Sequence, residues 1–138
     1  MAGDLAKKIN EAIQKLVVRV VQKVTLDTVA NLQAAPSEGG TPVDTGWARA
    51  NWVPSIGAPV TATAGTRAEA EAGQLDTNAV TQGTQQVLGY NSVRQGNVYI
   101  SNNVPYIELL NNGYSPQASP FFVQDAIAKA VLQDLRNI

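Results

Sequence analysis

Asp44, Arg49 and Glu108 are the side chains whose types and spacing could do chemistry in this sequence. Asp44 could act as an acid or base with Arg49 as an anion clamp, and Glu108 is the one acid between residues 100 and 122. No second carboxylate lies near Glu108 in the sequence to divide the acid and base roles. We therefore interpret Asp44 as a turn-forming residue, and Arg49 and Glu108 as structural or interface residues.

The composition narrows the function classes further. The chain has 138 residues, a net charge of −1, no histidine and no cysteine. The commonest general base and metal ligand is therefore absent, as are disulfides and thiolate metal sites. A near-neutral charge gives no overall field towards nucleic acid or a charged membrane. We expect a single domain over residues 1–138 that is not an enzyme, with no cofactor and no metal site.

No targeting or membrane segment is visible. The first eight residues are polar, and the apolar run Leu16–Val21 is interrupted by Arg19. A bilayer-spanning helix needs about 20 apolar residues, and this run is far shorter. The sequence predicts a protein made in the cytoplasm, without a membrane partner.

The predicted fold class is α+β, in which a long N-terminal helix and a C-terminal helix pack on a small, mainly antiparallel β-sheet. We expect a long helix in residues 1–35 and a linker and strand in 36–59. A flexible arm in 60–75 is followed by a helix, a strand, a short helix and the C-terminal helix in 76–138. At about 1.5 Å per residue the first helix would be roughly 45 Å long. Because that exceeds the width of a small core, part of it should pack against another molecule.

The two tryptophans lie near the first expected strand, Trp47–Val53, which Pro54 and Pro59 should bound. Residues five apart on a strand point to opposite faces. One tryptophan should therefore lie in the core, and the other under the long helix or in a partner.

The later elements follow from apolar spacing and turn residues. A helix is expected over Asp76–Leu88, where Gly83 costs about 1 kcal/mol, and a strand over Asn97–Ser101. Asn103 is a candidate cap for a helical turn at Pro105–Leu110. The last helix should start at Ser119 or Pro120 and run to about Arg136. Its expected inner face is Phe122, Ala126, Ile127, Ala130, Val131 and Leu135.

Four asparagines in this region leave two interpretations open. Asn102, Asn103, Asn111 and Asn112 flank the short helix in pairs. Asparagine closes turns with its own side chain and tolerates left-handed backbone, which is a structural role. The same amides could instead donate hydrogen bonds to a neighbouring subunit.

A resemblance to a known family lies in two blocks, PVDTGWARANWVPSIGAP and YISNNVPYIELLNNGYSPQASPFFV. Together they resemble the neck, or tail-completion, proteins of tailed bacteriophages. Ser119 is inserted into the Gln-Ala-Pro step of that pattern. The matching segments are Pro42–Gly46, Arg49–Trp52, Gly57–Pro59, Ile100–Tyr106, Glu108–Gly113 and Ser115–Pro120.

The resemblance implies a structural virion protein of the head–tail junction, made in the host bacterial cytoplasm. It would form a homo-oligomeric ring, a hexamer, between head-connector or head-closure proteins and tail terminator or tail tube proteins. Non-specific contact with DNA in the channel would be its one nucleic-acid contact. The side chains expected at these interfaces are Trp47, Arg49, Trp52, Asn102, Asn103, Tyr106, Glu108, Tyr114 and Gln117.

Other functions compete with this interpretation. The chain could be a tail terminator or head-closure ring protein instead. A small hydrolase would use Asp44 and Glu108, without histidine to assist them. A nucleic-acid-binding module would use the basic residues of the first helix, which are interleaved with acids. These are Lys7, Lys8, Lys15, Arg19 and Lys23.

Overall fold

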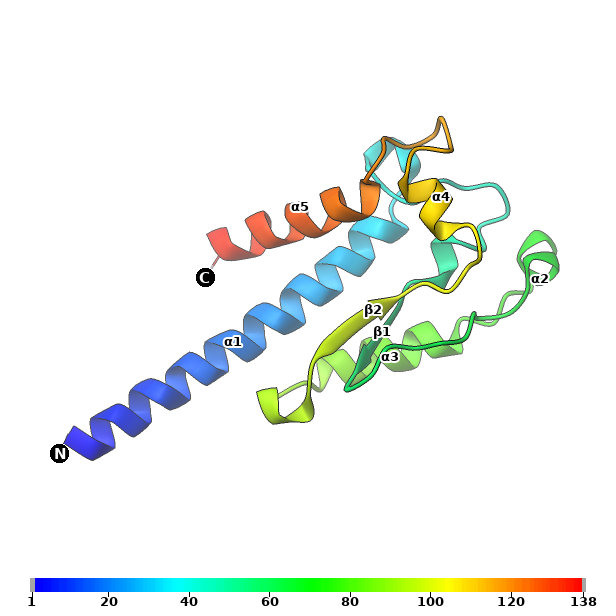
Figure 1. Ribbon diagram of the computed structural model, residues 1–138. Helices are drawn as coiled ribbons and strands as arrows, with labels where there is room; N and C mark the ends of the chain where they lie inside the picture. The colour runs from blue at the N-terminus through cyan, green and yellow to red at the C-terminus, as the bar shows by residue number, and fades with distance from the viewer. Residues whose placement is uncertain (1, 138) are drawn as a thin grey trace.

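The computed structural model describes residues 2–137 and has the expected α+β fold (Figure 1). A long helix, α1 (Ala2–Gln33), runs along most of the molecule, and the C-terminal helix α5 (Phe122–Arg136) lies against its C-terminal half. The other helices are α2 (Arg67–Glu71), α3 (Asn78–Leu88) and α4 (Ile107–Asn111). Three short 3₁₀ helices are η1 (Pro36–Glu38), η2 (Arg49–Asn51) and η3 (Val93–Gln95).

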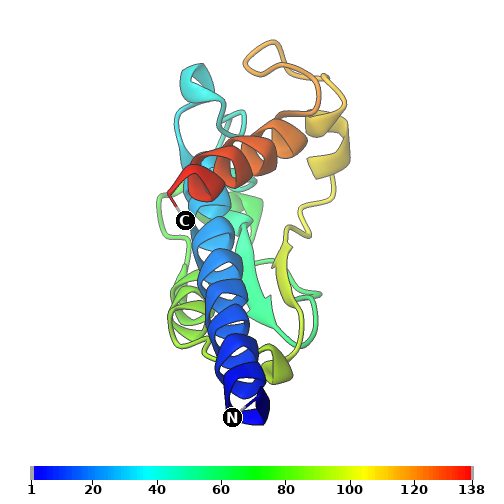
Figure 2. The same ribbon diagram turned by 90° about the vertical axis from the view of Figure 1, so that its left-hand side faces the viewer.

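The sheet consists of two antiparallel strands, β1 (Val53–Ile56) and β2 (Val98–Ser101). Val53 pairs with Ser101, and Ile56 pairs with Val98. Helix α3 packs on β1, while α1 contacts both strands as well as α5. Figure 2 shows α5 crossing in front of α1, with the η3–β2 segment on one side of α1 and α3 on the other. The small sheet is therefore contacted by both α1 and α3.

The core lies at the C-terminal end of α1, where Leu32, Trp52, Phe122 and Ala126 form one buried cluster. The indole Nε1 of Trp52 donates to the hydroxyl of Thr41 at 2.8 Å. That hydroxyl donates in turn to the carbonyl oxygen of Leu32 at 2.7 Å. The polar atoms of this core therefore satisfy one another while the apolar surfaces pack.

The expected excess length of the first helix is confirmed. The buried residues of α1 are Thr25, Thr28, Val29 and Leu32, all near its C-terminal end. The N-terminal turns extend past both α5 and the sheet (Figure 1). Only part of α1 therefore belongs to the core of its own chain.

The strand expected over Trp47–Val53 is wrong in its position. Asn51 donates from Nδ2 to the carbonyl of Trp47 at 2.8 Å, and its Oδ1 accepts from the backbone N–H of Ala64 at 2.6 Å. Such side-chain bonds to the backbone compete with an extended ladder. Residues 47 and 48 therefore form a turn, residues 49–51 form η2, and β1 starts at Val53. Pro54 lies inside the strand rather than after it, which is tolerated because both strands of this sheet are edge strands.

Smaller corrections concern helix starts. Helix α3 begins at Asn78 rather than Asp76, with Thr77 as its N-cap, and the carboxylate of Asp76 accepts the Asn78 N–H at 2.8 Å. Asn103 does not cap α4, since its amide donates to the Val60 carbonyl at 2.8 Å. The last helix starts at Phe122, after Phe121 with a φ of 65°. Gly113, with a φ of 93°, follows the C-terminal end of α4.

Candidate functional site

Three segments that are distant in the sequence meet at one end of the molecule, and we call this meeting point the corner. It consists of the turn at residues 42–48, Tyr106 and Leu110 at α4, and Ser115 and Gln117 in the following loop. These residues enclose a small cavity of about 70 Å³. Both blocks that carry the family resemblance contribute to it.

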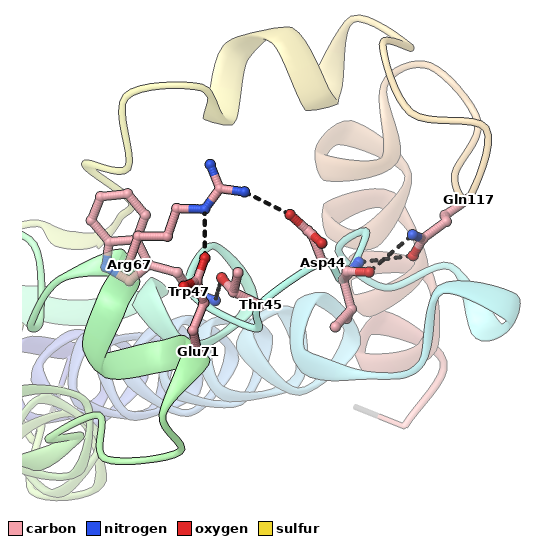
Figure 3. Close-up of polar contacts among 7 residues, drawn as sticks. Asp44, Thr45, Trp47, Arg67, Glu71 and Gln117 are labelled. Atoms are coloured by element: carbon pink, nitrogen blue, oxygen red, sulfur yellow. Dashed lines mark hydrogen bonds and ion pairs between the residues drawn. The ribbon is translucent and has the colours of Figure 1, made fainter.

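Gln117 joins the loop to the turn through its side-chain amide. Its Oε1 accepts the backbone N–H of Val43 at 2.9 Å, and its Nε2 donates to the Val43 carbonyl at 2.9 Å (Figure 3). One amide therefore satisfies both backbone groups of a single residue, as a neighbouring strand would. This pairing fixes the position of an otherwise irregular loop.

An exposed ion pair closes the other side of the corner. Arg67 on α2 donates to Asp44 at 2.7 Å and lies 3.5 Å from Glu71 (Figure 3). Asp44 therefore pairs with Arg67 and not with Arg49, which lies exposed on η2. Glu108 is exposed on α4 and does not line the cavity with Asp44. The two acids considered for hydrolysis are not brought together there.

Of the two tryptophans, Trp47 lies in the corner and Trp52 lies in the core. Trp47 is partly buried, with its ring centroid 6.0 Å from that of Tyr106 and the planes tilted by 60°. Its Nε1 is buried and meets no hydrogen-bond acceptor within residues 2–137. Trp52 is only 5% exposed, so its expected place at an interface is wrong. One tryptophan was expected in the core, as the structure has it. The reason is different, because neither tryptophan lies in β1, which starts at Val53.

The side-chain amides of Asn102, Asn103 and Asn111, three of the four asparagines, bond within the chain, which supports the structural interpretation. Asn102 donates to the carbonyl of Ala48 at 2.9 Å, and its Oδ1 accepts the Val104 N–H at 3.1 Å. The Oδ1 of Asn111 accepts the Val123 N–H at 3.0 Å, near the start of α5. Tyr114, by contrast, is 78% exposed beside these braced segments.

A pair of carboxylates from α1 and α5 was missed in the sequence. Asp134 is 2% exposed, and Lys23 lies 3.5 Å from Asp134 Oδ1 and 3.6 Å from Asp27 Oδ2. Within the described chain neither oxygen of Asp134 has a hydrogen-bond partner. A signal existed, because the four-residue steps from Phe122 through Ala126 and Ala130 lead to Asp134.

The surroundings of Asp27 favour its protonated form. Burial raises the pKa of Asp27, and the neighbouring Asp134 carboxylate raises it further, while Lys23 acts in the opposite direction. Between the ordinary carboxyl pKa and the raised one, the folded chain holds a proton that the unfolded chain has released. The free energy of unfolding should therefore fall as pH rises through this window.

Replacing Asp134 with asparagine should raise the free energy of unfolding at pH 7 by about 1 kcal/mol, because an amide can donate to the Asp27 carboxylate. The fall with rising pH should also become shallower. Urea unfolding between pH 3.5 and 7.5 measures both effects. Asp125→Asn is the control on the same helix, since Asp125 is exposed in its first turn and should give no gain. A less stable Asp134→Asn variant with an unchanged pH profile would contradict this account.

Comparisons with other proteins add no further assignment. No family model, no curated protein and no solved structure matches the chain. From residue 2 to residue 137, no helix is long and apolar enough to cross a membrane. The corner and the residues around it are therefore the basis of the functional argument.

Proposed function

We propose that this chain is a structural subunit of the bacteriophage head–tail junction, a neck or tail-completion protein that forms a ring, a hexamer, between the head connector and the tail. The observation that carries the proposal is the corner. Gln117 of the second resembling block holds Val43 of the first at 2.9 Å, and Tyr106 packs on Trp47. The separated segments of the resemblance thus form one braced unit.

The type of bonding in the corner supports a docking role. Backbone turns are held by side-chain amides, and the ion pair of Asp44 with Arg67 is exposed, with side-chain exposures of 79% and 53%. An exposed pair of this kind contributes only about 0–1 kcal/mol. Amides that fix loop positions without reactive groups suit a surface whose shape is recognised by a neighbour.

The proposed neighbours follow from a position in the neck. Head-connector or head-closure proteins would contact one side of the ring, and tail terminator or tail tube proteins the other. The proposed place of action is the virion, after synthesis in the host bacterial cytoplasm. Non-specific contact with DNA would involve the basic residues of α1, among which Lys23 is already engaged by Asp27 and Asp134.

Removing the gene from the phage that encodes the chain should give DNA-filled heads and separate tails, with few joined particles. Electron microscopy of lysates measures this, and immunogold labelling of wild-type particles should mark the junction. Label on free tails or on free heads alone would favour a tail terminator or a head-closure protein, respectively. Normal infective particles without the chain would contradict the proposal.

The hydrolase alternative predicts a different result in the same assay. Asp44→Asn and Glu108→Gln remove both candidate catalytic acids while preserving side-chain size. If the chain is structural, particles carrying both changes should join and infect at close to the wild-type level, since both acids are exposed. Normal joining with lost infectivity would favour the enzyme.

A further inference from the structure

The N-terminal half of α1 carries an apolar face that is exposed in the structure of residues 2–137. Leu5, Ile9, Ile13 and Leu16 follow one another at steps of four, four and three residues, which places them on one side of a helix. Their exposures are 60%, 51%, 54% and 39%. We call these four residues the stripe. Four large apolar side chains in a row on a projecting helix indicate a surface that becomes buried in an assembly.

An apolar groove of about 710 Å³ begins where the stripe ends. Its floor is the next part of α1, from Val17 to Val24. One wall is α5, with Val131 and Leu135, and the other is the η3–β2 segment, which includes Val93. Figure 1 shows α5 and β2 on opposite sides of α1. The groove therefore has the form and chemistry that receive an amphipathic helix.

The stripe cannot fill the groove of its own chain. Helix α1 is continuous from Ala2 to Gln33, so the stripe and the groove floor are successive parts of one rod. We propose that the stripe of one copy lies in the groove of a second copy of this chain. This inference rests on the proposed ring function and names the surfaces through which its subunits join.

The distribution of exposed apolar residues identifies a second copy as the occupant. Across the described residues, thirteen large apolar side chains are exposed. Seven of them belong to the stripe or line the groove, so one contact between copies would cover more than half of the set. They are Leu5, Ile9, Ile13, Leu16, Val17, Val93 and Leu135. A net charge of −1 adds little repulsion between copies.

The contact joins two different surfaces and is therefore heterologous. If each copy gives its stripe to the next, the contacts close a ring. If two copies exchange stripes, they close a dimer. Both outcomes support the stripe–groove contact, whereas a closed dimer in the virion would contradict the proposed ring.

Cysteine cross-linking tests the contact directly, because the chain has no cysteine of its own. Ile9→Cys places a thiol on the stripe, and Leu135→Cys places one on the groove wall. Mixed and mildly oxidised, these variants should give a disulfide between positions 9 and 135, identified by peptide mass spectrometry. Leu109→Cys on α4 is the matched control, since Leu109 is 53% exposed and lies outside the groove. The yield with Leu135→Cys should exceed the control at least about tenfold.

Analytical ultracentrifugation gives an independent readout. Ile9→Asp with Ile13→Asp disables the stripe, and Val93→Asp with Leu135→Asp disables the groove, all at exposed positions. Each double variant should associate with itself about 30-fold more weakly than wild type. A mixture of the two should regain one contact and form heterodimers. The stripe–groove contact would be contradicted by equal cross-linking yields with Leu109→Cys and Leu135→Cys. It would also be contradicted if the mixture of the two double variants stays monomeric while wild type associates. Neither result would bear on whether the chain is present in the virion.

Discussion

Replacing Trp52 with alanine should lower the free energy of unfolding by about 3–5 kcal/mol. The indole is 5% exposed and packs in one cluster with Leu32 and Phe122, so its removal leaves a cavity at the junction of α1, β1 and α5. A domain of this size has about 5–15 kcal/mol of stability in total. Chemical denaturation followed by circular dichroism measures the loss, which should also lower the Tm on the order of 10–20 °C.

A second substitution separates packing from hydrogen bonding at Trp52. Trp52→Phe keeps an aromatic ring but removes the donor that contacts Thr41 at 2.8 Å. The Thr41 hydroxyl still donates to the Leu32 carbonyl at 2.7 Å, so no donor is left unpaired there. The hydrogen-bond part of the loss should therefore be about 1 kcal/mol.

Trp47→Ala is the matched control for removal of an indole. Trp47 is only partly buried, and its Nε1 has no partner in the part of the chain that the structure describes. The loss should be about 1 kcal/mol, with the fold retained, because no side-chain hydrogen bond is broken and the ring is only partly buried. Equal losses at the two positions would show that both tryptophans belong to the core.

Local periodicity was sufficient to predict α1, α3 and α5, but not α2, which lies in the expected flexible arm, nor the way the helix ends and loops are held. The apolar steps along residues 5–32 predicted α1 closely, because they extend over many turns. Val98–Ser101 was also found, since it is a short β-rich run between turn signals. The strand near Trp52 was misplaced because Asn51 bonds to Ala64, a residue thirteen positions later. Local residue propensities cannot predict a hydrogen bond to a residue so distant in the sequence.

For the candidate site, the sequence likewise indicated the residues but not the contacts between them. The sequence indicated which residues of the corner are unusual, including Trp47, Tyr106 and Gln117. It did not indicate that Gln117 bonds to Val43, or that Arg67 rather than Arg49 pairs with Asp44. Asp134 was overlooked because an acid was not expected on a buried helical face. Its burial depends on α1, which supplies Asp27 and Lys23.

Gly83 lowers the stability of its own helix but allows that helix to pack closely on the sheet. In a helix interior, glycine is about 1 kcal/mol less favourable than alanine. Gly83 is nevertheless buried where α3 crosses β1, and a Cβ there would overlap the carbonyl oxygen of Pro54. The absence of a side chain therefore allows close helix–strand packing.

Gly83→Ala should destabilise the chain by about 1–3 kcal/mol, because displacing α3 from the backbone of Pro54 outweighs the gain in helix propensity. Gly89→Ala is the matched control at the end of the same helix. Gly89 has a φ of −87°, and the nearest atom to an added Cβ is the Gln86 carbonyl oxygen at 3.5 Å, an ordinary contact. It should be neutral or stabilising by up to about 1 kcal/mol. Urea denaturation of both variants decides the sign, and a stabilised Gly83→Ala would mean that α3 does not pack this closely on β1.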